Sequence, residues 1–83
     1  MNPYIKMLYA MFTEIKEAVD KARAEAEPDE RFIQHSIIDM NCIRTILFEC
    51  EYHLSYDHTT NSYSIHKVND KYARIHNYEE ATV

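Results

Sequence analysis

Glu51, His53 and His66, in the C-terminal half of the chain, are of types that bind zinc. The stretch between Asp57 and Ser62 has the composition of a turn. If residues 58–61 form the loop of a β-hairpin, apolar residues pair with apolar residues and His53 lies opposite His66. Cross-strand neighbours have Cβ atoms about 5 Å apart, so both imidazoles and the Glu51 carboxylate could share one Zn²⁺ ion. A solvated polar sheet face explains the same residues, and the sequence favours that simpler interpretation.

Half of the acidic residues fall in the seventeen positions between Glu14 and Glu30. The formal net charge is −5, so we do not expect direct binding to nucleic acid or to an anionic membrane. Carboxylates on a helix are complementary to a basic surface on a larger protein. The residues predicted to contact such a partner are Glu14, Glu17, Asp20, Glu25, Glu27, Asp29 and Glu30. Lys16, Lys21 and Arg23 interrupt this row, and an ordinary solvated helix face is the competing explanation.

Tyrosine is abundant in the C-terminal half, at positions 52, 56, 63, 72 and 78. Its large ring and polar hydroxyl make tyrosine common both in thin cores and at protein interfaces. We expect Tyr52, Tyr56 and Tyr63 to pack beneath a helix. Tyr72 and Tyr78 are the better candidates for contact with a partner.

The chain contains no glycine. Phosphate-binding loops, dinucleotide-binding turns and strained nucleophile turns all need glycine at fixed positions, so none of them is expected here. No local arrangement places a nucleophile beside an oriented base. We therefore expect no cofactor and no enzymatic activity.

Cys42 and Cys50 are too few for a disulfide framework, and the N-terminus does not have the order of residues of a signal peptide. No apolar run approaches the roughly 20 residues that cross a bilayer. These features predict a cytoplasmic protein, with Cys50 as a small buried residue of a strand.

Residues 1–26 have the pattern of an amphipathic helix. Asn2 and Pro3 are typical of a helix start. Apolar residues then recur at steps of three and four, from Ile5 to Ala26. The N-terminal half carries large apolar side chains and should pack on a sheet. The alanine-rich C-terminal half should project or pair with another helix.

Residues 29–43 are predicted as a second helix, although their β-branched residues also fit a strand. From Ile46 to Tyr56 every second residue is apolar, which favours a strand beginning near Arg44. The same region also keeps helical spacing as far as Leu54. One continuous helix from Asp29 to Tyr56 is therefore the rival interpretation.

Together these patterns predict one α+β domain over residues 1–83. A long N-terminal helix and a second helix pack on an antiparallel hairpin within residues 44–77. A third strand at residues 71–76 would extend the hairpin to a three-stranded meander. Residues 78–83 are predicted to be a frayed tail.

The function that these features predict is non-catalytic binding to a larger protein. By analogy with small acidic phage proteins that inhibit host enzymes or defence systems, the chain is expected to inhibit or modulate its partner, for example a nucleic-acid-processing protein. A structural protein that forms homo-oligomers, for example a homodimer, is the first alternative. A zinc-binding protein or a small metal-dependent enzyme is the second.

Overall fold

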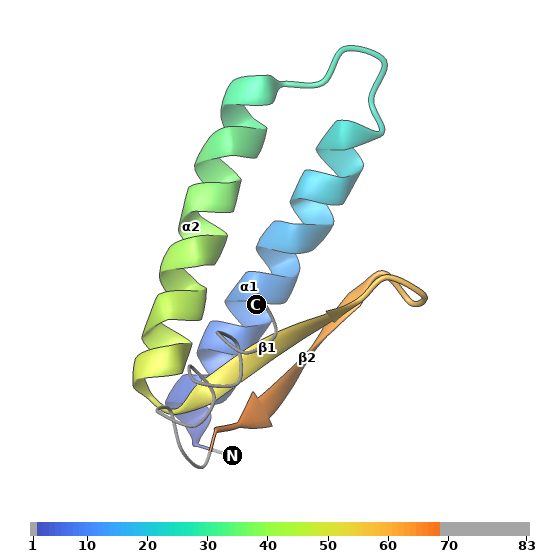
Figure 1. Cartoon of the computed structure of the whole chain (residues 1–83). Coiled ribbons are helices and arrows are strands. Elements are labelled where there is room, and N and C mark those ends of the chain that lie inside the picture. The colour runs from blue at the N-terminus through green and yellow to red at the C-terminus, as the bar shows by residue number, and fades with distance from the viewer. Residues whose placement is uncertain (1, 69–83) are drawn as a thin grey trace, which may run out of the picture.

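The computed structural model describes residues 2–68, which form two long helices followed by a β-hairpin (Figure 1). The elements are α1 (Pro3–Arg23), α2 (Glu30–Glu49), β1 (Tyr52–Asp57) and β2 (Ser62–Lys67). The predicted α+β class is confirmed, with the helices packed on a two-stranded antiparallel sheet. The strand predicted at residues 71–76 and the tail at residues 78–83 lie outside the described residues.

Helix α1 begins where the sequence predicts. The Asn2 Oδ1 atom accepts a hydrogen bond from the Tyr4 backbone N–H at 2.7 Å, and Pro3 stands in the first turn. The helix ends at Arg23, before the predicted end at Ala26. Residues 23–27 are all exposed, and a helix end that buries no apolar face gains nothing from tertiary packing.

Helix α2 corrects the predicted start of the sheet. The strand expected from Arg44 is wrong, because α2 continues to Glu49. Leu47 explains the outcome: a strand with Ile46 and Phe48 on its buried face would turn Leu47 to solvent, whereas the helix buries it completely. The rival continuous helix is also wrong, since β1 follows from Tyr52.

The chain reverses between α2 and β1 at Glu51, whose φ of 69° is left-handed. The Glu51 N–H donates to the Phe48 carbonyl at 2.9 Å, and the Glu51 carbonyl accepts from Val68 N–H at 2.7 Å. Glycine usually takes this position after a helix, and this chain has none. Cys50 caps the helix and is exposed, so the prediction of a buried strand residue is wrong.

The register predicted for the hairpin is confirmed. Leu54 pairs with Ile65, Tyr56 with Tyr63, and His53 with His66. Because side chains alternate along a strand, this register directs Leu54 and Ile65 toward the helices.

Two apolar clusters hold the elements together. The first joins both helices to the hairpin. It contains Ile5, Leu8 and Phe12 from α1, Ile43 and Leu47 from α2, and Leu54 from β1. The second joins only the helices, through Val19, Ala22 and Ile33. The N-terminal half of α1 therefore packs on the sheet, and its alanine-rich half pairs with α2.

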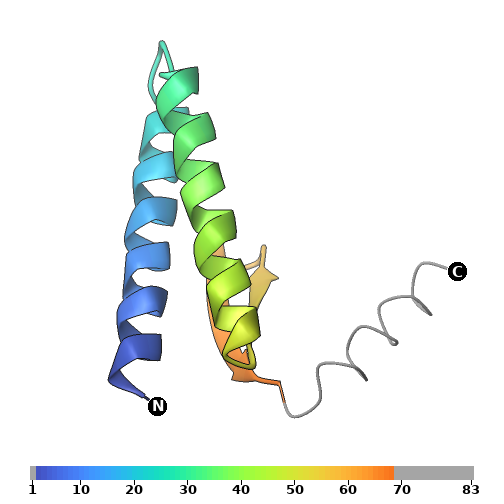
Figure 2. The ribbon, with the colours of Figure 1, turned by 90° about the vertical axis from the view of Figure 1, so that its left-hand side faces the viewer.

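The hairpin covers only one side of the helix pair, as the two views show (Figures 1 and 2). Its tip diverges from the helices in Figure 1, while its base lies near the start of α1 and the end of α2. Within residues 2–68, neither helix is both long enough and apolar enough to span a membrane. This arrangement leaves two surfaces to consider: a cleft under the hairpin tip, and the opposite face of the helices.

Candidate functional site

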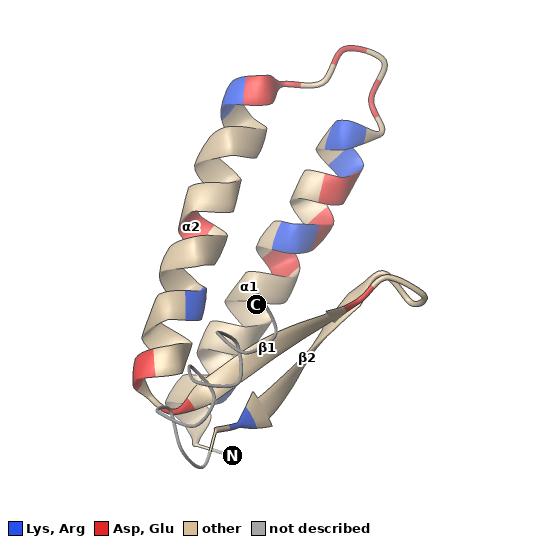
Figure 3. Cartoon of the chain, in the orientation of Figure 1, with Lys and Arg blue, Asp and Glu red and all other residues tan. Residues whose placement is uncertain are grey.

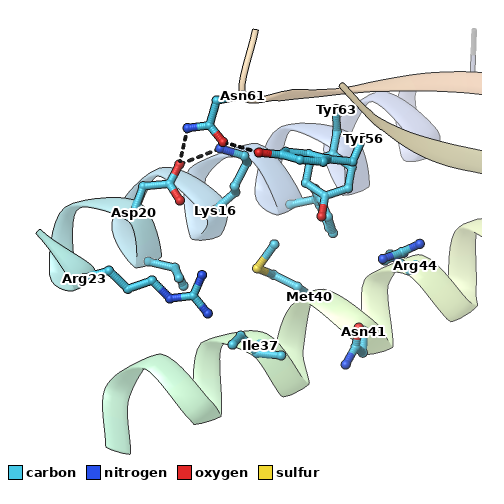
Figure 4. Close-up of a pocket in the computed structure, with 12 residues that line it drawn as sticks. Lys16, Asp20, Arg23, Ile37, Met40, Asn41, Arg44, Tyr56, Asn61 and Tyr63 are labelled. Atoms are coloured by element: carbon cyan, nitrogen blue, oxygen red, sulfur yellow. Dashed lines mark hydrogen bonds and ion pairs between the residues drawn. The ribbon is translucent and has the colours of Figure 1, made fainter. Parts of the chain in front are cut away.

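A cleft of about 440 Å³ lies between α1, α2 and the hairpin tip (Figure 4). It forms where the hairpin diverges from the helices. Val19, Ile37 and Met40 supply its apolar lining, and Tyr56 and Tyr63 line it from the hairpin. Its volume falls within the range of about 300–1,000 Å³ that is typical of small-molecule sites.

A chain of polar contacts ties the hairpin tip to α1. The Tyr56 hydroxyl donates to Asn61 Oδ1 at 2.6 Å, and Asn61 Nδ2 donates to Asp20 Oδ2 at 3.3 Å. The Lys16 ammonium forms an ion pair with the same Asp20 oxygen (Figure 4). The Asp20 carboxylate is thus already engaged, and its contacts set the spacing between α1 and the hairpin tip.

Asn61 can make these contacts because its backbone is left-handed, with φ of 54°. Asparagine is among the few residues other than glycine that tolerate this conformation. Its amide side chain then reaches both Tyr56 and Asp20, which a glycine could not do. Asn61 therefore both adopts the left-handed conformation that the turn needs and closes one side of the cleft with its side chain.

The cleft is lined by an excess of positive charge, although the protein is acidic. Among the described residues that line it, Lys16, Arg23 and Arg44 contribute three cations against the single carboxylate of Asp20. Arg44 lies over the Tyr63 ring, with 6.0 Å between its guanidinium carbon and the ring centroid. Within residues 2–68, neither Arg23 nor Arg44 forms a salt bridge with a carboxylate.

Aromatic side chains make the hairpin wall of the cleft rigid. The rings of Phe12 and Tyr63 meet edge to face, with centroids 4.8 Å apart. Tyr56 and Tyr63 are cross-strand neighbours, with ring centroids 5.0 Å apart. The Tyr9 hydroxyl fixes the same strand to α1 by donating to the Tyr63 carbonyl at 2.7 Å. With Arg44 of α2 over its ring, Tyr63 is therefore held by contacts from both helices.

The structure separates the acidic residues that the sequence groups together (Figure 3). Glu14 and Glu17 are exposed on α1, whereas Asp20 is half-buried in the cleft. Glu25, Glu27, Asp29 and Glu30 gather at the connection between the helices and are all exposed. The predicted acidic surface is therefore not one continuous face: its largest exposed part is the end of the molecule formed by residues 25–30.

One of these acids has a structural role. Asp29 Oδ1 accepts a hydrogen bond from the Phe32 backbone N–H at 3.1 Å and caps α2. Glu30 stands in the first helical turn, where the helix dipole favours a negative charge. Glu25 and Glu27 precede the helix, and they are the better positions at which to test the role of charge alone.

The predicted zinc ligands are only partly brought together. His53 does lie opposite His66, but Glu51 belongs to the reversal after α2 and is not a strand residue. His66 Nε2 lies 3.0 Å from the Ser64 hydroxyl oxygen. No cluster of three or more histidine, cysteine, aspartate or glutamate side chains with metal-binding geometry occurs among residues 2–68. The reversal after α2 therefore takes Glu51 off the strand face of the two histidines, and two histidines alone do not complete a zinc site.

The tyrosines divide between core, cleft and residues that are not described. Tyr56 and Tyr63 line the cleft, and the Lys67 ammonium lies 5.5 Å from the centroid of the Tyr52 ring. The predicted partner-binding residues Tyr72 and Tyr78 lie outside the described residues. Their proposed contact with a partner stays a prediction.

The second surface is the face of the helix pair that the hairpin leaves uncovered. Met7 and Met11 each lie two residues from Tyr9, which contacts the hairpin, and Ile46 lies two residues from Arg44, which also does. Residues two positions apart project from nearly opposite sides of a helix, so these apolar side chains point away from the hairpin. Tyr4 lies one helical turn before Met7 on the same side of α1. This open helix face consists of Tyr4, Met7, Met11 and Ile46, each between 40% and 49% exposed.

Sequence reasoning missed both surfaces, although each left a signal. Tyr4, Met7 and Met11 form a second apolar stripe beside the core stripe of α1. Lys16 and Arg23, which interrupt the acidic row, line the cleft. The contribution of Asn61 depends on the path of the hairpin, which no local pattern reveals.

Comparison of the chain with protein families, with curated proteins and with solved structures gives no match. The function is therefore argued from the two surfaces themselves.

Proposed function

We propose that the chain is a non-catalytic module that docks on a larger protein through the open helix face and modulates or inhibits that protein. One observation carries the proposal: four large apolar or aromatic side chains, Tyr4, Met7, Met11 and Ile46, are exposed on a face of the helix pair that no other described segment covers. Contiguous exposed apolar surface on a small protein is characteristic of interaction sites. Methionine and tyrosine are also enriched at such interfaces.

The acidic end of the helix pair suits a partner with a basic surface. Glu25 and Glu27 are exposed, and neither forms a salt bridge with another residue in the range 2–68. Charges at the edge of an interface mainly accelerate association and select among partners, whereas apolar anchors supply most of the affinity. The proposed division of roles is therefore apolar anchoring by the open helix face and electrostatic steering by residues 25–30.

The proposed setting is the reducing cytoplasm, because Cys42 and Cys50 are both exposed free thiols. A homodimer is the second candidate, because a second copy of the chain could cover the same open face. The mass in solution separates the two: a value above the 9.9 kDa of one chain that falls when the face is altered indicates self-association.

The test compares two variants with matched chemistry. Met7→Glu with Met11→Glu introduces two charges into the open helix face. The control, Gln34→Glu with Thr59→Glu, introduces two charges at exposed positions of α2 and of the hairpin loop that are not part of the open helix face. Partners captured by the wild type are purified, and their Kd values are measured against both variants. We expect the first variant to lose about tenfold or more in affinity, since buried apolar anchors dominate binding energy.

Circular dichroism checks that both variants remain folded. Equal affinity of the two variants for every purified partner would refute the assignment of the open helix face. Replacing Glu25 and Glu27 with lysine should lower the association rate constant and change the dissociation rate constant less. The association rate of this variant should also depend less on salt concentration.

A further inference from the structure

We propose that the cleft under the hairpin tip binds a small aromatic oxyanion, a compound that carries a phosphate or carboxylate group on a flat apolar body. This site lies on the opposite side of the helix pair from the open helix face, and it does not depend on the protein-docking function proposed above. Three features of the cleft lead to this ligand: its charge, its lining and its fixed walls.

The charge of the cleft favours an anion. Lys16 and Asp20 neutralise each other through their ion pair, which leaves Arg23 and Arg44 without a carboxylate partner among residues 2–68. Guanidinium groups bind phosphate and carboxylate oxygens with two parallel hydrogen bonds. In a protein of net charge −5, this is a local positive field that attracts an anion into a hollow.

The lining between the two arginines requires an apolar body. Figure 4 shows Met40 and Ile37 on α2 between Arg23 and Arg44, with the tyrosines facing them from the hairpin. Val19 closes the cavity beneath and is 4% exposed. A methionine thioether and two tyrosine rings form favourable contacts with a flat aromatic group.

The walls of the cleft are set before any ligand enters. Tyr63 is held by Phe12 and by the Tyr9 hydroxyl, and Arg44 lies over the Tyr63 ring. Asn61 ties the opposite side to Asp20. A site held in place in this way loses less conformational entropy on binding than a flexible surface would.

The experiment uses four probes on the full chain: 1-naphthyl phosphate, 1-naphthoate, 1-naphthol and inorganic phosphate. Binding is followed by ¹H–¹⁵N correlation spectra during titration. We expect saturable shifts centred on Met40, Arg44 and Asn61 with the first two probes. The stronger of these two shows whether the site prefers phosphate or carboxylate. The neutral naphthol and the ring-free phosphate should each bind about tenfold or more weakly, because each lacks one of the two parts that the cleft recognises.

Arg44→Gln should weaken binding of the better probe about tenfold or more, because it removes the charge-assisted hydrogen bonds. The matched control is Arg31→Gln, which makes the same change at an exposed position outside the cleft. Both arginines are exposed, so neither substitution disturbs the core. The proposal is overturned by an absence of saturable shifts, by naphthol or inorganic phosphate binding as tightly as the combined probes, or by equal effects of the two arginine variants.

Discussion

Replacing Glu51 with glycine should stabilise this protein, although most substitutions destabilise a fold. Glu51 has φ of 69° at the reversal between α2 and β1. A residue with a Cβ atom loses about 1–2 kcal/mol in this conformation, because the Cβ approaches the following carbonyl oxygen. Glycine has no such clash, and both backbone hydrogen bonds of Glu51 remain available to it.

The gain is reduced by the unfolded state, where glycine has more freedom to lose, at a cost of about 0.4–1 kcal/mol. The net expectation is about 0.5–1 kcal/mol of added stability. For a domain of 60–100 residues this corresponds to a rise in Tm of about 2–8 °C. Urea denaturation followed by far-ultraviolet circular dichroism measures the free energy of unfolding, and a thermal scan measures Tm.

Two further variants isolate the backbone effect. Glu51→Ala removes the carboxylate but keeps the Cβ atom, so it should gain little. Asn61→Gly also relieves a left-handed residue, with φ of 54°, but it loses the hydrogen bonds to Tyr56 and Asp20 and should not stabilise. If Glu51→Gly unfolds at the same urea concentration as Glu51→Ala or at a lower one, the reasoning from left-handed strain is refuted.

Three other substitutions test the elements that position the two surfaces, all by urea denaturation. Tyr9→Phe should lower the free energy of unfolding by about 1 kcal/mol, because it removes the hydroxyl that donates to the Tyr63 carbonyl. A loss no larger than that of the exposed control Tyr4→Phe would contradict this role. Asp29→Ala should cost about 1 kcal/mol through loss of the α2 cap, whereas Glu27→Ala, two residues away, should be nearly neutral. Leu47→Ala should cost about 2–5 kcal/mol, since Leu47 is fully buried, and a smaller loss would contradict its place in the core.

Local patterns were sufficient for much of the fold. The start of α1 at Asn2 and Pro3 follows from capping chemistry between neighbours in sequence. The hairpin register follows from loop length together with the alternation of apolar residues, so the pairing of His53 with His66 was predictable. Both arguments involve only residues close together in the chain.

The boundary between α2 and β1 could not be settled in this way. Residues 46–50 fit a strand by alternation and a helix by the spacing of Ile43 and Leu47. Burial of Leu47 in one cluster with Phe12 of α1 decides for the helix, and Phe12 is distant in sequence. When a segment has both the alternating pattern of a strand and the apolar spacing of a helix, tertiary packing decides which of the two forms.

The sequence by itself determined the α+β class, the pairing of the strands and the excess of acidic residues. Only the tertiary structure decided which charges are exposed at the end of the helix pair and which line a cleft, because Asp20 and Asn61 meet across 41 positions of the chain. It also decided that, among residues 2–68, one face of the helices stays uncovered, because the hairpin packs on one side of the helix pair. Local chemistry sets the elements, but the surfaces they form depend on how the elements pack.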